Sequence, residues 1–249
     1  MIEFRDVSKH FGDTKVVDNF SIEIPSHSSL ALVGSSGCGK TTLLRMVNRM
    51  VEPDSGSVCI DGEDVAGVNP VLLRRSIGYV IQGGGLLPHR TVLDNVATVG
   101  YLLKWDRGKA RRRARSLLQK VGLDSQLEGR YPAELSGGQQ QRVGVARALL
   151  TDPNILLMDE PFGAVDPIVR YELQRKLLAL QQDLGKTIIL VTHDIAEAFY
   201  LADKVAVLEP GARIAQWGTP QDIKQNPQSD FVRAMIRAVQ FEDTHDVAD

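Results

Sequence analysis

Cysteine is scarce in this sequence, and so is net charge. Only two of the 249 residues are cysteines, Cys38 and Cys59, which is too few for a disulfide framework and suits a reducing compartment such as the cytosol. The formal net charge is −2, so the charge balance gives no reason to expect a polyelectrolyte partner such as nucleic acid. Internal repeats and low-complexity segments are also lacking. These absences favour an ordinary globular protein.

Long hydrophobic runs are absent as well. The longest, at residues 155–158 and 188–191, have the length of buried strands and fall far short of the ~20 residues that span a bilayer. The first residues, Met1 to Asp6, do not contain the apolar centre of a signal peptide. We therefore expect a cytoplasmic protein, which must dock on other chains if it serves a membrane system.

The apolar pattern predicts an α/β fold. Residues 2–7 and 17–24 alternate apolar and polar side chains, as half-buried antiparallel strands do. A short apolar run at 30–33 leads into a glycine-rich loop, and a helix opens at Lys40. The remaining pattern predicts further strands at 57–60, 77–81, 155–158, 188–191 and 205–208, and a helix at 196–202.

Between about residues 88 and 150 the pattern changes. Apolar residues such as Ala110, Ala114 and Leu118 recur there at helical spacing, and strand signals vanish. We expect a single domain over 1–235, in which a helical subdomain at 88–150 is inserted into a core formed by 1–87 and 151–235. A short acidic tail at 236–249 follows.

A phosphate-binding motif occupies residues 34–41. Gly34-Ser35-Ser36-Gly37-Cys38-Gly39-Lys40-Thr41, followed by Thr42, matches G-x-x-x-x-G-K-[ST] and lies between a predicted strand and helix. Its glycines let backbone N–H groups face phosphate oxygens, and the following helix adds positive charge at its N-terminus. Lys40 is expected to reach the β- and γ-phosphates, and the Thr41 hydroxyl to ligate Mg²⁺. The motif alone therefore predicts only that the chain binds a nucleoside triphosphate together with Mg²⁺.

A second motif, Leu135-Ser136-Gly137-Gly138-Gln139, follows roughly 95 residues later. On its own it is a weak signal, since Ser-Gly-Gly is typical of turns. With the phosphate-binding loop upstream, it resembles the signature motif of the ATP-binding cassette (ABC) family. The resemblance implies a P-loop NTPase (RecA-like) core with an antiparallel β subdomain and an inserted α-helical signature subdomain.

The apolar run at 155–158 ends in Asp159 and Glu160, which looks like a Walker B element. Asp159 is predicted to hold Mg²⁺, directly or through water, as the corresponding aspartate does in P-loop NTPases. By resemblance, Glu160 is the general base for the attacking water, a role that contributes ~10²–10⁴-fold in rate. His193 matches the family's switch histidine, which binds the γ-phosphate. Catalysis is thus expected from Glu160, His193 and Lys40.

Gln82 matches the family's Q-loop glutamine, which senses Mg²⁺ and the γ-phosphate and couples the core to the helical subdomain. Three glycines, Gly83, Gly84 and Gly85, follow it where the family usually has bulkier residues. Consecutive glycines either make this segment more mobile or permit close backbone packing, and the sequence leaves both interpretations open.

Phe11 sits where the family places an aromatic ring that stacks on adenine. The alternative, a hairpin aromatic that packs on the core, also stays open.

The signature residues are expected to serve a neighbouring chain. In the family's architecture, Leu135 to Gln139 lie far from the P-loop of their own chain and meet the γ-phosphate that a partner holds. Asp166 matches the D-loop aspartate, which belongs to the same in-trans set. Two ATP molecules are then sandwiched in a twofold homodimer, which ATP closes and hydrolysis reopens.

Local sequence narrows the resemblance to bacterial osmoprotectant importers. Segments such as 69–82, 102–105 and 130–132 look like the ATPase subunits that energise uptake of glycine betaine, choline, carnitine or related quaternary amines, and the resemblance covers about residues 1–235. It implies a peripheral protein on the cytoplasmic face of the bacterial cell membrane. The region near 83–105 is expected to bind the permease subunits. An extracytoplasmic solute-binding protein, which delivers the solute to the permease, is expected as an indirect partner.

Other ABC proteins stay open as alternatives. An importer of amino acids or another small solute has the same cassette, because the cassette does not touch the solute. A non-transport ABC ATPase acting on nucleic acid is the more distant alternative, suggested by the arginines between Lys109 and Arg115. Alanines and leucines lie on the opposite helix face, so we expect a solvated basic face and no nucleic acid. Many osmoprotectant relatives carry a C-terminal regulatory CBS pair, which we do not expect in this chain, and ionic-strength gating through this subunit stays an open question.

Overall fold

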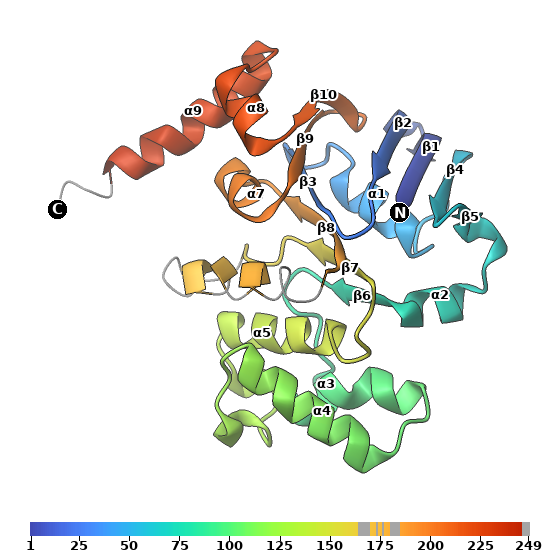
Figure 1. Cartoon of the computed structure of the whole chain (residues 1–249), viewed down its shortest axis with the longest axis vertical. Coiled ribbons are helices and arrows are strands. Elements are labelled where there is room, and N and C mark those ends of the chain that lie inside the picture. The colour runs from blue at the N-terminus through green and yellow to red at the C-terminus, as the bar shows by residue number, and fades with distance from the viewer. Residues whose placement is uncertain (164–169, 173, 176, 180–184, 246–249) are drawn as a thin grey trace. The chain divides into compact units, whose positions relative to one another are not determined.

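The computed structural model describes residues 1–163, 170–172, 174–175, 177–179 and 185–245 (Figure 1). The chain divides into two compact units: unit 1 comprises Met1–Val68 and Thr187–Asp249, and unit 2 comprises Asn69–Lys186. Each unit is described by itself below. The domain boundaries expected from the sequence stay a prediction.

Unit 1 contains an antiparallel sheet with the strand order β2-β1-β4-β5. Along β1 the buried residues Ile2 and Phe4 alternate with more exposed neighbours, which is why the sequence there alternates apolar and polar residues. Phe4 meets Phe20 edge-to-face at 5.4 Å between ring centroids. The strands of this sheet are β1 (Ile2–Phe11), β2 (Thr14–Ile24), β4 (Ser55–Ile60) and β5 (Glu63–Asp64).

A second, mainly parallel sheet in unit 1 has the strand order β10-β9-β3-β8. β3 (Ser29–Gly34) pairs in parallel with both β8 (Thr187–Thr192) and β9 (Lys204–Glu209), and β10 (Arg213–Gly218) is antiparallel to β9. Every residue of β3 and β8 is buried, which explains their unbroken apolar runs. The helices of unit 1 are α1 (Lys40–Val47), α7 (Ile195–Leu201), α8 (Pro220–Gln225) and α9 (Asp230–His245), with a 3₁₀ turn at Val65–Gly67.

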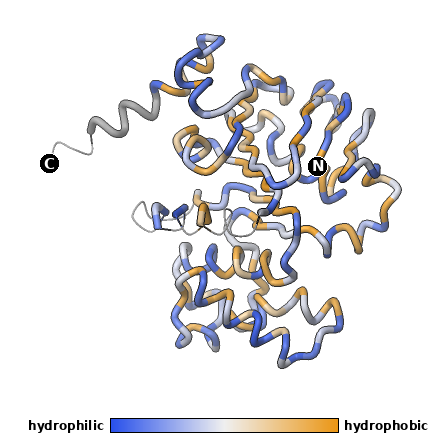
Figure 2. The backbone as a smooth tube through the Cα atoms, in the orientation of Figure 1, coloured by the Kyte–Doolittle hydropathy of each residue, from blue (hydrophilic) through white to orange (hydrophobic). Residues whose placement is uncertain are grey.

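Unit 2 is mostly helical. Its parallel strand pair, β6 (Ile77–Val80) and β7 (Ile155–Asp159), is in register with Tyr79 opposite Leu157. Among the residues described up to 163, its helices are α2 (Pro70–Ser76), α3 (Val92–Leu102), α4 (Arg107–Lys120) and α5 (Gly137–Ala148), with 3₁₀ turns at Ser125–Leu127 and Pro132–Glu134. Hydrophobic and hydrophilic positions alternate along these helices (Figure 2). Between β6 and β7 all regular structure is helical, as the loss of strand signals predicted.

The α/β prediction is confirmed, and each predicted strand is present within a few residues of its expected bounds. Sequence reasoning did not predict α2, β10, α8 or α9. Asn69 caps α2 and Pro70 follows at its first position, which is a readable start signal for a helix too short to show periodicity. In the part of the chain that the structure describes, no helix has both the length and the apolar character needed to cross a bilayer.

Candidate functional site

The predicted P-loop lies in unit 1, between β3 and α1. Lys40 is only 5% exposed, and its Nζ donates hydrogen bonds to the carbonyl oxygens of Gly34 at 2.7 Å and Ser35 at 2.9 Å. Gly39 has φ +109°, and a Cβ there would lie 2.7 Å from the Val16 carbonyl oxygen, so only glycine fits. The loop is thus wrapped around the Lys40 ammonium, with the Cys38 side chain buried beside it.

The N-terminus of α1 has no side-chain cap. Its N-cap residue is Gly39, and its first turn contains no acidic residue. By contrast, the described helices α2, α3, α4, α5, α7 and α8 each follow a residue whose side chain accepts a first-turn backbone N–H. A helix start without a side-chain cap directs backbone N–H groups and partial positive charge outward, which suits a phosphate group. Thr41 and Thr42 stand in this first turn.

His193 leaves the parallel sheet of unit 1 at the same edge as the P-loop. Val33 is paired with Thr192, so Gly34, the last residue of β3, and His193, the residue after β8, lie at the carboxyl ends of neighbouring strands. The buried Thr192 hydroxyl donates to the Glu197 carboxylate at 3.0 Å, and the Asp194 side chain caps α7. His193 therefore lies between two anchored residues while its own side chain is exposed.

Phe11 ends β1, and its side chain is 51% exposed rather than packed in the core. The Lys9 ammonium lies 5.7 Å from the centre of its ring and bonds to Asp54 at 2.6 Å. The Lys9 hydrogen bond and then the backbone N–H of His10 lower the pKa of Asp54 from its usual 3.8 to about 2. Asp54 thereby holds the end of β1, where the Phe11 ring is exposed.

The two acidic candidates lie in unit 2, at the end of β7. Asp159 is 2% exposed, and the Tyr79 hydroxyl donates to its Oδ2 at 3.3 Å. Glu160 has φ +45°, a left-handed conformation that costs a non-glycine residue on the order of 1 kcal/mol. Gln82 Nε2 donates to Glu160 Oε2 at 3.1 Å, which joins two predicted site residues 78 positions apart.

The glycine segment after Gln82 rests on α5. A Cβ on Gly84 would lie 3.0 Å from the Gln140 carbonyl oxygen, and one on Gly144 would lie 3.3 Å from the Gly84 Cα. Arg147, one helix turn further on, donates to the carbonyl oxygens of Gly84 and Gly85, each at 2.8 Å. Burial lowers the pKa of Arg147 from its usual 12.5. Of the two interpretations that the sequence left open, close backbone packing is what the Gly84–α5 contact shows.

The signature residues form the start of α5. Ser136 is the N-cap, and its Oγ accepts the Gln139 backbone N–H at 3.3 Å. The Gln139 side chain accepts the Ser136 backbone N–H at 2.9 Å, which completes a capping box. Gly137 and Gly138 occupy the first two helical positions, and Leu135 is buried just before the cap.

The predicted site residues thus fall into two sets. Unit 1 places Lys40 and His193 at one sheet edge, and unit 2 joins Gln82 to Glu160 beside the buried Asp159. Asp166 lies outside the described residues.

Comparison with known proteins identifies the family. The family model for ABC transporters matches residues 17–163. This chain belongs to the ABC transporter family. The chain is 49% identical over 237 residues to the choline transport ATP-binding protein OpuBA of Bacillus subtilis strain 168, which covers 95% of this chain and 62% of the relative. It is 48% identical over 233 residues to the glycine betaine uptake system ATP-binding protein YehX of Escherichia coli K12, covering 94% of this chain and 75% of that one.

Solved structures of the ABC family agree with the fold. A dimeric post-hydrolysis state of the ATP-binding cassette MJ0796 bound to ADP and phosphate has a TM-score of 0.81 and 31% identity, covering 88% of this chain and 99% of that one. The predicted cassette fold is therefore confirmed. The chain spans about three fifths of the length of the first curated relatives that it matches, 62% for OpuBA.

Several side chains around the candidate sites were missed by sequence reasoning. Tyr79, Arg147 and Asp54 contact predicted site residues or the segments that carry them. A signal existed for the start of α5, because Ser136 and Gln139 form the S-x-x-Q spacing of a capping box. No local sequence pattern predicts the hydrogen bonds of Arg147, because the carbonyl oxygens that it binds lie 62 and 63 residues away.

Proposed function

We propose that this chain is the ATP-hydrolysing subunit of an ABC importer. The observation that carries the proposal is the start of α1 without a side-chain cap, behind a loop that surrounds Lys40, in a member of this family. Such a helix start would bind the phosphates of ATP through backbone N–H groups from Gly34 to Thr42. Lys40 would exchange its bonds to the loop carbonyls for bonds to the β- and γ-phosphates.

Hydrolysis would follow from a small number of side chains. Glu160 would accept a proton from the attacking water, and Gln82, already bonded to Glu160, would position that carboxylate. His193 would donate to the γ-phosphate from the sheet edge beside the P-loop. Phe11 would stack on the adenine ring, which needs the exposed orientation that it has.

The residues present fit Mg²⁺. The proposed ligands are the Thr41 hydroxyl, the Gln82 amide and the Asp159 carboxylate, all hard oxygen donors. Among the described residues no cluster of three acidic, histidine or cysteine side chains occurs, and Mg²⁺ at a nucleotide site needs only one or two carboxylates besides the phosphates. When bound, Mg²⁺ would neutralise charge on the transferred phosphoryl group.

We also propose that the active unit is a homodimer. Ser136, Gly138 and the start of α5 would meet the γ-phosphate on the partner's P-loop, and Leu135, Gly137, Gln139 and Asp166 belong to the same in-trans set. The relative MJ0796 is a dimeric cassette. A second copy would explain why the capped start of α5 is glycine-rich, with Ser136 and Gly137 exposed.

The transported solute is proposed to be an osmoprotectant such as glycine betaine, choline or carnitine. The support is the similarity to proteins named for choline transport and glycine betaine uptake. The chain is proposed to bind permease subunits near residues 83–105 and to lie peripherally on the cytoplasmic face of the cell membrane. A solute-binding protein is proposed as an indirect partner. The cassette domain is proposed to span 1–235. A nucleic-acid function is disfavoured because Arg111 and Arg115 already pair with Asp94 and Glu128.

Two measurements test these proposals. Purified chain should release phosphate from ATP in the presence of Mg²⁺. Lys40→Ala should lower that rate by roughly 10²-fold or more, while the exposed Lys120→Ala leaves it unchanged. Radiolabelled glycine betaine, choline and methionine would then be offered to cells with and without the gene. If cells without the gene lose only methionine uptake, the solute is methionine and not an osmoprotectant. The ATPase assignment would be unaffected by that result.

A further inference from the structure

His193 lies at the centre of a short turn that follows β8. The Thr192 hydroxyl accepts the Asp194 backbone N–H at 3.1 Å, which is the bond of a serine/threonine turn, from one residue to the second after it. This bond holds the peptide unit between His193 and Asp194. The exposed His193 side chain therefore extends from a turn that is fixed by a buried side chain, since Thr192 is only 2% exposed.

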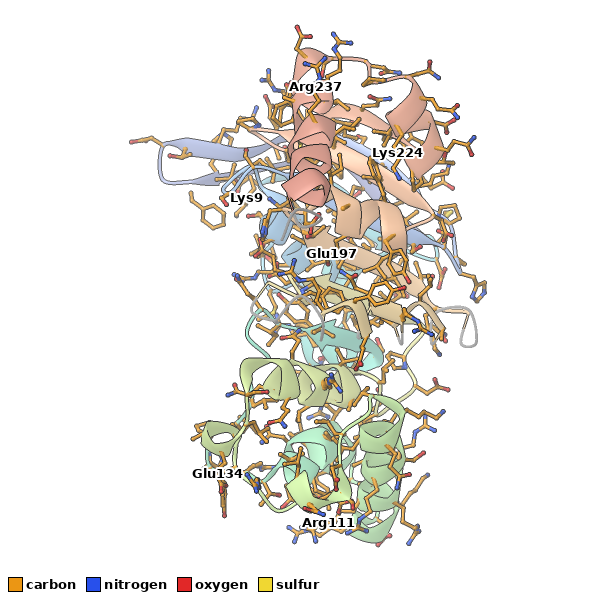
Figure 3. All side chains as sticks on the ribbon, turned by 90° about the vertical axis from the view of Figure 1, so that its left-hand side faces the viewer. Lys9, Arg111, Glu134, Glu197, Lys224 and Arg237 are labelled. Carbon is orange, nitrogen blue, oxygen red and sulfur yellow. The ribbon has the colours of Figure 1, made fainter. Side chains whose placement is uncertain are left out.

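Glu197 orients the Thr192 hydroxyl. It lies in the first turn of α7, is labelled in Figure 3, and is 6% exposed. Its Oε2 accepts the hydrogen bond of that hydroxyl at 3.0 Å. A hydroxyl group has one proton to donate and two lone pairs that accept. Because the proton is directed to Glu197, a lone pair faces the Asp194 N–H, and the turn around His193 is held in one arrangement.

This start of α7 differs from an ordinary capping box. In a capping box, the side chain of the third helical residue accepts the backbone N–H of the N-cap residue, as Gln139 does for Ser136 at the start of α5. Asp194 and Glu197 have the same spacing at α7. Here the Thr192 hydroxyl accepts the Asp194 N–H, and Glu197 binds that hydroxyl. The acid is thereby bonded to the residue that precedes His193.

Capping of α7 does not by itself account for the buried acid. The Asp194 carboxylate already accepts the backbone N–H groups of Ala196 and Glu197, at 2.8 and 3.1 Å. A carboxylate is costly to remove from water unless hydrogen bonds compensate it, although the N-terminus of a helix favours negative charge. What the Glu197 carboxylate adds to this cap is its bond to Thr192.

The turn lies at the sheet edge that carries the P-loop. β8 and β3 are parallel neighbours, with Thr192 paired with Val33. A shift of the backbone at His193 would therefore move its imidazole relative to the phosphate site of the same unit. Misplacing a group by about 1 Å at a reacting centre can lower a rate ~10²-fold. The hydrogen bonds that fix this turn thus bear directly on hydrolysis.

We propose that Glu197 is a positioning residue for ATP hydrolysis, which acts through the Thr192 hydroxyl to hold His193 in its working orientation. The inference rests on the proposed function, in which His193 donates to the γ-phosphate. Glu197 itself touches neither nucleotide nor water in this account. Its loss should slow the hydrolytic step and leave ATP binding nearly unchanged.

Two valine variants on the same strand test the proposal in the full chain. Thr192→Val keeps the β-branched shape that suits β8 and removes the hydroxyl. Thr187→Val is the matched control at the other end of β8, because Thr187 is 5% exposed and its hydroxyl accepts the His27 backbone N–H at 3.0 Å. Both variants lose a buried hydroxyl that accepts a backbone N–H, so both should unfold at similar urea concentrations.

Only Thr192→Val should lower kcat for ATP hydrolysis, by roughly 10-fold or more, while its KM for ATP changes by less than about 2-fold. Thr192→Ser restores a hydroxyl and should recover most of the lost rate. A role of Thr192 in stability alone would affect the two valine variants alike.

Variants of Glu197 test the other end of the bond and leave β8 unaltered. Glu197→Leu removes the acceptor and should lower kcat as Thr192→Val does. Glu197→Gln keeps an oxygen that can accept the Thr192 hydroxyl, so it should recover most of that loss. The double variant of Thr192→Val and Glu197→Leu should be about as slow as either single variant, because both changes break the same hydrogen bond.

Equal kcat in Thr192→Val and Thr187→Val overturns the proposal, and so does a double variant in which the two losses multiply. His193→Ala separates this inference from the proposed function. A parental kcat in His193→Ala would contradict the role that the proposed function gives to His193. A slow His193→Ala beside a fully active Glu197→Leu would overturn the role of Glu197 alone.

Discussion

Gln82 Nε2 lies 3.1 Å from Glu160 Oε2, so the residue after β6 donates a hydrogen bond to the residue after β7. Glu160 holds its position at the cost of a left-handed backbone, with φ +45°. A strained acid that is positioned by an amide has the geometry expected of a proton acceptor prepared before substrate arrives. The Gly84–α5 contact, two residues after Gln82, then links this pair to the helix that Ser136 caps.

Gln82→Ala removes the hydrogen bond that the Gln82 amide donates to Glu160. Gln82→Ala is expected to lower kcat for ATP hydrolysis by ~10–100-fold, the range for a hydrogen bond to a charged group, with a smaller change in KM. Steady-state kinetics would measure both. Gln119→Ala, on the exposed face of α4, is the control and should keep the parental kcat. An unchanged kcat in Gln82→Ala would show that the bond has no role in hydrolysis.

The Gly84–α5 contact predicts that Gly84 tolerates no side chain. Gly84→Ala must place its Cβ 3.0 Å from the Gln140 carbonyl oxygen at φ +77°, so it should lower the free energy of unfolding by about 1–3 kcal/mol. Gly83, which has φ +69° and open space around it, is the matched control, and Gly83→Ala should cost only the backbone strain. Urea unfolding of the two variants decides the matter. Equal stability would mean that this loop does not rest on α5 in solution.

Ser136 has two tasks under the proposed function, as the cap of α5 and as a partner of phosphate. Ser136→Asp should keep the cap, so the free energy of unfolding should change by less than ~0.5 kcal/mol. The added negative charge would face the partner's γ-phosphate, so ATP hydrolysis should fall at least ~10-fold. Ser136→Ala is the complementary variant, which loses the cap and about 1 kcal/mol. Full activity in Ser136→Asp would remove Ser136 from the phosphate site.

The lowered pKa of Asp54 predicts that the free energy of unfolding falls in acid. Because its pKa is lowered from 3.8 to about 2 in the folded chain, it contributes stability that is fully present above pH ~4 and is lost as the pH falls towards 2. Asp54→Asn should therefore reduce the free energy of unfolding at pH 6 and show a weaker decline between pH 4 and 2. Asp13→Asn, in the neighbouring β1–β2 turn, is the control for loss of one charge. Identical acid dependence of the two variants would contradict the role given to the Lys9–Asp54 pair.

The sequence specified those parts of the fold and site that depend on local pattern. The strand–loop–helix around Lys40, the buried strand before Asp159 and the glycine-rich signature each carry their signal within a few neighbouring residues. The contacts between them depend on packing between distant segments: Gln82 with Glu160, and Arg147 with Gly84. Nothing near Arg147 in the sequence distinguishes it from the arginines of α4, because its partners, the carbonyl oxygens of Gly84 and Gly85, lie 63 and 62 residues away.

Under the proposed function, ATP is held between two copies of this chain and hydrolysed through Glu160. The mass of purified Glu160→Gln, determined by light scattering with and without MgATP, tests this arrangement. We expect a monomer without nucleotide, a stable dimer with MgATP, and no dimer when Lys40→Ala is added. A Glu160→Gln chain that stays monomeric in MgATP and still hydrolyses ATP at the parental rate would contradict it.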